Sequence, residues 1–167
     1  VLYKNDKRNA ETYKSIKQTN HKLKESNDRY DIVAKATSDT IWDWKIPEDN
    51  ITWNKGIKGI YGYNQDQIGK TSKWWFDNIH PEDSIKMSIK LYSFLEQKTE
   101  KWQDQYRFKC ADDTYKYILD RGFIIKDKKG KAIRMIGAIQ DITKQKEEEN
   151  RLKLLETVFT EARDSII

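Results

Sequence analysis

Histidine and cysteine, which often carry out catalysis or bind metals, are scarce in this sequence. Its 167 residues include two histidines and a single cysteine, Cys110. A metal site needs several His, Cys, Asp or Glu ligands, and a nucleophilic triad needs a histidine beside its nucleophile. His21 has polar neighbours, which is typical of a solvated helix residue, and His80 precedes Pro81, which indicates a turn before a helix. We therefore expect no metal site.

The acidic residues and the glycines do not form a recognisable active site either. Glu82 and Asp83 follow Pro81, where negative charge suits the start of a helix. The glycines between Lys55 and Gly69 do not follow the G-x-x-x-x-G-K-[ST] phosphate-loop pattern. We therefore expect no catalytic residues in this chain and predict no cofactor, while an unknown small ligand stays open.

Composition and charge exclude several classes of partner. Hydrophobic residues make up 37% and charged residues 35%, which suits a core flanked by charged helices. The net charge is +5, but acids are interspersed among the basic residues of 1–35, so we expect no nucleic-acid partner. No run approaches the roughly 20 apolar residues of a membrane span. The single cysteine suits a reducing compartment. We expect a cytoplasmic domain without direct membrane contact, whose parent protein could still be membrane-anchored.

Residues 1–35 contain neither Gly nor Pro and carry a heptad repeat typical of a short coiled coil. An Asn at an a position lowers stability but favours a parallel dimer, and this repeat has two. We expect a homodimer through this seam, and the alternative is an amphipathic helix that folds back on its own domain. The seam residues are Tyr13, Ile16, Asn20, Leu23, Asn27 and Tyr30.

The central part of the chain predicts two short strands, short helices, one longer helix and three antiparallel strands. This order indicates an α+β fold with a five-stranded antiparallel sheet. The expected ranges are 40–46 and 51–54 for the first strands, 55–69 for short helical turns, 74–80 for an aromatic short helix, 81–97 for the longer helix, and 102–110, 115–126 and 133–139 for the last strands.

Three of these elements carry apolar residues on a face that their spacing defines. In the strand 102–110 these residues are Trp102, Tyr106, Phe108 and Cys110. In the strand 115–126, Arg121 falls in the apolar phase, so either a bulge at Gly122 shifts the register or an arginine points inward. The apolar residues are Tyr115, Tyr117, Leu119, Phe123 and Ile125 in that strand, and Ile85, Ile89, Tyr92 and Leu95 in the helix 81–97.

Four short motifs follow one another along the chain. They are Ile41-Trp42-Asp43-Trp44, His80-Pro81-Glu82-Asp83, Tyr106-Arg107-Phe108 and the D-I-T ending, Gly137 to Thr143. Together they make residues 30–143 resemble a PAS domain of the subclass found in bacterial sensor kinases. The resemblance implies short helices on one face of the sheet and signalling helices at both ends. It divides the chain into an N-terminal helix (1–35), a PAS sensory domain (36–143) and a C-terminal signalling helix (144–167).

The resemblance implies a sensory and dimerisation module of a bacterial two-component signalling protein, with a histidine kinase as the parent. Asp141, Ile142 and Thr143 would then relay a change in the sheet to the helix after them. Residues 158–166 repeat part of the pattern of residues 33–41, which predicts a second copy of the domain in tandem. Adjacent PAS and kinase domains are the expected partners in the parent chain.

A small-molecule receptor, binding haem, flavin or another ligand, is one alternative, and a purely structural dimerisation spacer is another. Flavin photochemistry of the LOV branch needs a cysteine on the short central helix, but Cys110 ends a strand. Large aromatic residues could line a pocket between sheet and helices, or they could fill it as a packed core. The expected lining is Trp53, Tyr61, Trp74, Trp75, Phe76, Phe108 and Tyr117.

Overall fold

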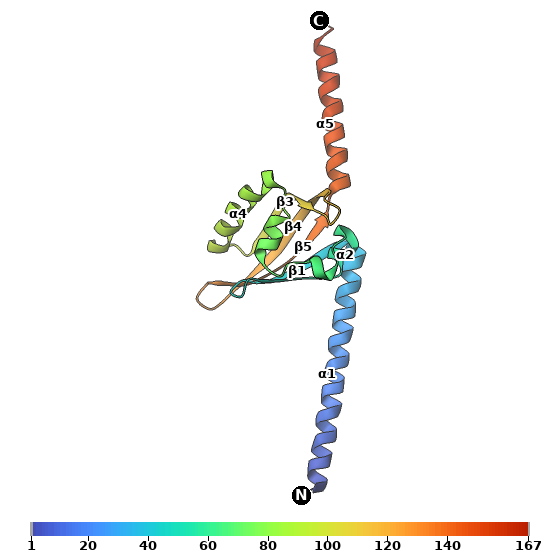
Figure 1. Cartoon of the computed structure of the whole chain (residues 1–167), viewed down its shortest axis with the longest axis vertical. Coiled ribbons are helices and arrows are strands. Elements are labelled where there is room, and N and C mark those ends of the chain that lie inside the picture. Colours follow the sequence, from blue (N-terminus) through green and yellow to red (C-terminus); the bar gives the residue numbers. More distant parts are fainter. Residues whose placement is uncertain (1, 167) are drawn as a thin grey trace. The chain divides into compact units, whose positions relative to one another are not determined.

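The computed structural model describes residues 2–166, which divide into an N-terminal helix and a domain that begins at Ser38 (Figure 1). Helix α1 spans Leu2–Thr37, two residues beyond the predicted end. Ser38 then adopts a positive φ of 55°, a conformation that ends a helix. The side chains of the predicted seam are exposed on α1.

The domain is built on one five-stranded sheet in which neighbouring strands all run antiparallel, so the predicted α+β fold is confirmed. The strand order is β2-β1-β5-β4-β3, which places the last strand in the centre of the sheet. The strands are β1 Asp39–Lys45, β2 Asn50–Trp53, β3 Lys101–Lys109, β4 Tyr115–Lys126 and β5 Ala132–Asp141.

Short helices and one longer helix cover one face of this sheet (Figure 1). The buried core lies between the two layers and is dominated by aromatic and aliphatic side chains of β1, β3, β4, β5 and the helices. The helices are α2 Gly56–Tyr61, the 3-10 helix η1 Gln65–Gln67, α3 Ser72–Asp77, α4 Pro81–Glu96 and, after the sheet, α5 Thr143–Asp164.

The face of strand β4 that packs in the core is not the face that its apolar spacing predicts. Arg121 is exposed and its Nη2 atom donates a hydrogen bond to Gln140, and Gly122 stays in register with Gly137. Neither a bulge at Gly122 nor an inward arginine therefore exists, and the register shift lies instead between Ile125 and Lys126. The apolar phase faces outward, and the buried phase consists of Ile118, Asp120 and Ile124.

Helix α4 shows the same kind of difference. Ile85, Ile89 and Tyr92, which share a helix face, are exposed, and the core side of α4 is formed by a second apolar stripe. In that stripe, Phe94 lies against Trp102 of β3, with ring centroids 5.3 Å apart. The buried residues of α4 are Met87, Leu91 and Phe94.

The start of α4 is fixed to β3 by a cluster of charged and polar groups. Arg107 donates from Nε and Nη2 to the two carboxylate oxygens of Asp83 at 2.9 and 2.8 Å, and from Nη2 to Glu82. His80 Nδ1 accepts from the Glu82 N–H, and the His80 ring contacts Tyr115. Hydrogen bonds from Arg107, opposed by partial burial, hold the pKa of Asp83 below its usual range. The cluster joins the sheet to the helical layer.

Replacing Arg107 with methionine should lower the free energy of unfolding by about 1–2 kcal/mol at pH 7. The pKa of Asp83 is lowered, so its contribution exists above the unfolded-state pKa and is lost as the pH falls through the folded-state value. The deficit of the variant should therefore shrink at pH 3. Urea unfolding at both pH values measures it, and Lys73→Met, which breaks the exposed Lys73–Asp77 pair, should change little.

Candidate functional site

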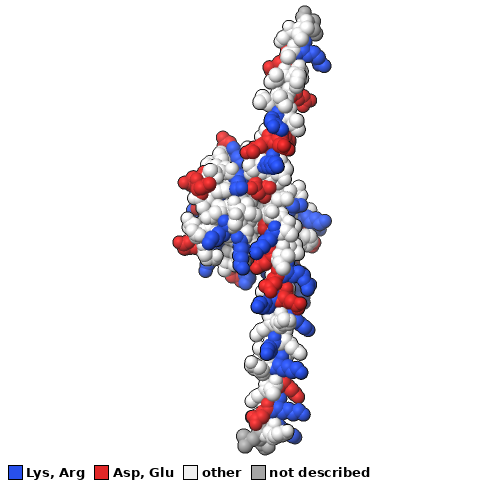
Figure 2. All heavy atoms as spheres, turned by 90° about the vertical axis from the view of Figure 1, so that its right-hand side faces the viewer, with Lys and Arg blue, Asp and Glu red and all other residues white. Residues whose placement is uncertain are grey.

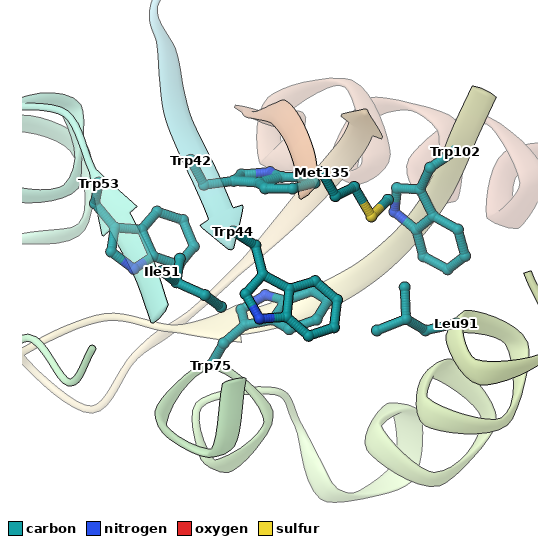
Figure 3. A pocket seen from close by; sticks show the side chains of 8 residues that line it. All are labelled: Trp42, Trp44, Ile51, Trp53, Trp75, Leu91, Trp102 and Met135. Atoms are coloured by element: carbon teal, nitrogen blue, oxygen red, sulfur yellow. The ribbon is translucent and has the colours of Figure 1, made fainter. Parts of the chain in front are cut away.

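Five tryptophans from four elements meet between the sheet and the helices (Figure 3). The space that they enclose has a volume of about 10 Å³, which is about the room that one water molecule needs. Its lining is almost entirely apolar, so the cluster is close to a filled core in this conformation. The lining residues are Trp42, Trp44, Ile51, Trp53, Trp75, Leu91, Trp102 and Met135.

Two indole N–H groups of this cluster, those of Trp42 and Trp102, donate to a buried carboxylate, Asp120 of β4. Asp120 Oδ1 accepts from Trp42 Nε1 at 2.9 Å. Its Oδ2 accepts from Trp102 Nε1 at 3.2 Å and from the Tyr106 hydroxyl at 3.0 Å. Trp75 Nε1 in turn donates to the Tyr106 oxygen at 2.9 Å. The network links β1, β3, β4 and α3.

Asp120 is inaccessible to solvent, and no ion pair to it exists among residues 2–166. Burial raises the pKa of this carboxyl to about 7, although the hydrogen bonds from Trp102, Tyr106 and Trp42 act in the opposite direction. Burial also raises the pKa of the Tyr106 hydroxyl, which the nearby Asp120 carboxylate raises further. The phenol therefore stays neutral and keeps its hydrogen for Asp120.

Two facing glycines make room for the Trp42 indole. Gly137 of β5 pairs with both Trp42 and Gly122, so the ring lies over two strands. A Cβ at Gly137 would lie 2.3 Å from Trp42 Cζ2 and 2.3 Å from the Arg121 carbonyl oxygen. A Cβ at Gly122 would lie 2.8 Å from Trp42 Cη2. The glycine of the D-I-T ending thus serves the packing of an indole.

The residues predicted to line a pocket fall into three groups. Trp53 and Trp75 line the enclosed space described above. Tyr61, Trp74 and also Trp53 surround Phe108, with ring centroids 5.5, 6.2 and 6.4 Å from its ring.

The other two predicted lining residues lie elsewhere. Phe76 stacks on Tyr92 of α4, and Tyr117 belongs to the phase of β4 opposite the buried Ile118. Among the described residues the buried Tyr61 hydroxyl and Trp53 Nε1 have no hydrogen-bond partner.

The predicted coupling residues form a hydrogen-bonded junction between the sheet and α5. Asp141 Oδ1 accepts from the Thr143 N–H at 3.0 Å and from its hydroxyl at 2.6 Å, and Oδ2 pairs with Lys116. The Tyr117 N–H donates to Thr143 Oγ1, and the Ile142 N–H donates to the Tyr117 carbonyl. Burial opposes ionisation, but the bonds from Lys116 and Thr143 lower the pKa of Asp141 overall.

Sequence reasoning placed Trp102 and Tyr106 on one face of β3 but missed the carboxylate that they share. In β4, Asp120 lies in the same alternating phase as Ile118 and Ile124. This second apolar phase was the sequence signal that could have revealed the buried carboxylate. A polar residue in the middle of a buried phase indicates a hydrogen-bonded interior group.

The structure also bears on metal sites, membrane-spanning helices, nucleic-acid binding and the reactivity of Cys110. Within residues 2–166 no group of three His, Cys, Asp or Glu residues could hold a metal, and no helix is long and apolar enough to cross a membrane. Figure 2 shows acidic side chains among the basic ones along α1 on the face in view. Cys110 is buried, and burial raises the pKa of its thiol, which lowers its reactivity.

An open five-stranded sheet, helices on one face and a helix that leaves the last strand define a PAS-type sensory domain. The sequence profile of the family described as PAS fold matches residues 50–139, more than half of the chain. The chain therefore belongs to the PAS family. No curated protein sequence matches it significantly.

Several solved structures share the fold. A sensory box histidine kinase/response regulator from Burkholderia thailandensis is 23% identical, with 80% of this chain and 98% of that chain covered and a TM-score of 0.68. The N-terminal domain of a diguanylate cyclase with PAS/PAC sensor from Marinobacter aquaeolei is 21% identical (64% and 97% covered, TM-score 0.59). A PAS domain from Colwellia psychrerythraea is 26% identical (69% and 98% covered, TM-score 0.53).

Proposed function

We propose that this chain is the cytoplasmic sensory and dimerisation module of a bacterial signalling protein, with a histidine kinase as the parent. The observation that carries the proposal is the junction at Asp141, Ile142 and Thr143. These residues bond to β4 at Lys116 and Tyr117 and continue directly into α5. A change in the spacing of β4 and β5 would therefore move the first turn of α5.

In this proposal the module has no catalytic role and passes its signal as a homodimer. The exposed heptad residues of α1 support the dimer, because apolar side chains such as Ile16 and Leu23 gain from a partner helix. The exposed apolar residues Phe123 and Ile125 of β4 offer the second contact surface. Adjacent PAS and kinase domains of the parent chain would receive the signal.

Native mass spectrometry of the purified chain tests this proposal first. A species of twice the 20.0 kDa chain mass without additional mass is expected, because the aromatic cluster leaves almost no space for a ligand. A monomer would contradict the dimer. Extra mass that denaturation removes would favour a small-molecule receptor instead, and a visible absorption band with it would indicate haem or flavin.

Replacing Asp141 with alanine should loosen the start of α5 more than it destabilises the domain. The change removes the acceptor of the Thr143 N–H and the partner of Lys116, so we expect amide exchange in the first turn of α5 to accelerate about fivefold, or about 1 kcal/mol. Hydrogen exchange followed by mass spectrometry measures this rate. In the full-length parent, the same variant should weaken the response to the stimulus.

Asp112→Ala is a matched control for this variant. Asp112 Oδ1 accepts from the Thr114 N–H at 3.1 Å and from its hydroxyl at 2.6 Å, which repeats the local geometry of Asp141 and Thr143 in the turn between β3 and β4. It should leave exchange in α5 unchanged. Equal exchange in α5 for Asp141→Ala and wild type would contradict the relay.

A further inference from the structure

The carboxylate of Asp120 is the least expected group in the interior of this domain. It is completely buried, and burying a charge is costly unless the charge is paired or fully hydrogen-bonded. Its partners Trp42, Trp102 and Tyr106 are all neutral. The carboxylate is therefore held by donors alone, without a cation to fix its charge state.

The hydrogens of this network fit only the ionised form of Asp120. An indole N–H can only donate, and a hydroxyl donates one hydrogen. Trp42 and Trp102 donate to the carboxylate, while Tyr106 accepts from Trp75 and donates to the carboxylate. Every one of these hydrogens has an acceptor as long as Asp120 carries no hydrogen of its own.

A proton on Asp120 breaks this match. The carboxyl group then becomes a hydrogen-bond donor. With the proton on Oδ2, this oxygen is a poorer acceptor for the hydrogen bonds from Trp102 and the Tyr106 hydroxyl. If the new O–H turns to the Tyr106 oxygen, which already accepts from Trp75, the hydrogen of Tyr106 needs another acceptor. At least one buried donor loses its partner, so the cluster has to repack.

Two opposing effects bring the two forms of Asp120 close in free energy. The hydrogen bonds favour the ionised form, and burial favours the neutral form, so that the pKa of Asp120 is about 7. The titratable groups that act on it are Tyr106 and Asp104 from β3 and Tyr61 from α2, and none of them can carry a positive charge. β1 and α3 contribute only indoles to the network, and the partner of Asp120 in β5 is Ile139.

We propose that Asp120 is a proton-binding site and that reversible protonation of its carboxylate repacks the tryptophan cluster. The proton comes from the solvent and bonds to a carboxylate oxygen, and no other bond changes. If the relay proposed above holds, the domain thereby responds to acidification. Asp120 lies on the strand that contacts Thr143, and Trp42 packs on Gly137 of the strand that ends at Asp141.

Protonation of Asp120 should make the stability of the folded domain depend on pH in a definite direction. The folded-state pKa of Asp120 lies above the ordinary value of 3.8, so the folded chain binds the proton more tightly than the unfolded chain. The contribution of Asp120 to stability is therefore largest below the unfolded-state pKa and declines as the pH rises through about 7. Urea unfolding from pH 5 to pH 8 should show this decline, and Asp120→Asn should remove it.

Nuclear magnetic resonance of the chain with 13C-labelled aspartate and 15N-labelled tryptophan tests the site directly. One carboxyl carbon should titrate with a midpoint near 7, and the indole N–H signals of the cluster should shift with the same midpoint. Asp120→Asn should abolish both titrations. Glu96→Gln, the same charge change on the exposed side of α4, should leave them unchanged. A midpoint below pH 5, or indole signals that stay constant between pH 5 and 8, would overturn the proposal.

A second variant keeps the test decisive if Asp120→Asn does not fold. Tyr106→Phe removes one donor to the ionised carboxylate, so the midpoint should move to higher pH. An unchanged midpoint would show that another group titrates. These readouts do not involve α5, so their failure would leave the proposed relay at Asp141 intact. Conversely, equal amide exchange in Asp141→Ala and wild type would contradict the relay but leave the proton-binding site intact.

Discussion

Replacement of Trp42 with alanine should lower the free energy of unfolding by about 3–5 kcal/mol, which makes it one of the two most damaging changes that we expect. The indole is buried, lines the centre of the aromatic cluster and donates to Asp120. Its loss creates a cavity and also leaves a buried carboxylate with one donor fewer. Urea or thermal unfolding followed by circular dichroism measures the change.

Trp42→Phe separates packing from hydrogen bonding. Phenylalanine keeps most of the ring but cannot donate to Asp120, so we expect a smaller loss of about 1–3 kcal/mol. Equal losses for both variants would show that the hydrogen bond dominates. A loss below about 1 kcal/mol for Trp42→Ala would contradict the central position of the indole.

Gly137→Ala should cost about 3 kcal/mol through overpacking instead of a cavity. The new Cβ would lie 2.3 Å from both the Trp42 ring and a carbonyl oxygen of β4, and a backbone atom cannot move aside like a flexible side chain. We expect the sheet between β4 and β5 to open locally. Thermal unfolding and amide exchange in both strands measure the effect.

Gly59→Ala is the control for this change. Gly59 lies within α2, and a Cβ there would meet no atom within 4 Å. Alanine is a better helix former than glycine, so the control should be neutral or slightly stabilising. A similar loss in both variants would contradict the steric explanation.

The element order and the D-I-T junction could be predicted because they depend on local patterns. β3 has one apolar and one polar face, so its alternation identified Trp102 and Tyr106 on the same side. In the same way, Asp141 and Thr143 mark a helix start through their own side chains.

The buried face of β4 could not be predicted in this way because both of its faces carry apolar residues. Leu119 and Phe123 face outward, while Ile118 and Ile124 enter the core. Alternation gives the period of a strand but not the phase that faces the helices. Asp120 therefore resembled a solvent-facing residue, and only its three-dimensional neighbours show that it is an acceptor for indoles.

The central position of β5 in the sheet has a consequence for how the protein folds during synthesis. Its neighbours are β1, which lies far back in the sequence, and β4. The β1–β2 and β3–β4 hairpins consist of local contacts and can form early, whereas β1 and β5 pair across a separation as large as Asp39 with Gln140. Long-range pairing of this kind slows folding. During synthesis on the ribosome, the two hairpins would therefore stay unconnected until β5 has emerged and pairs with both β1 and β4.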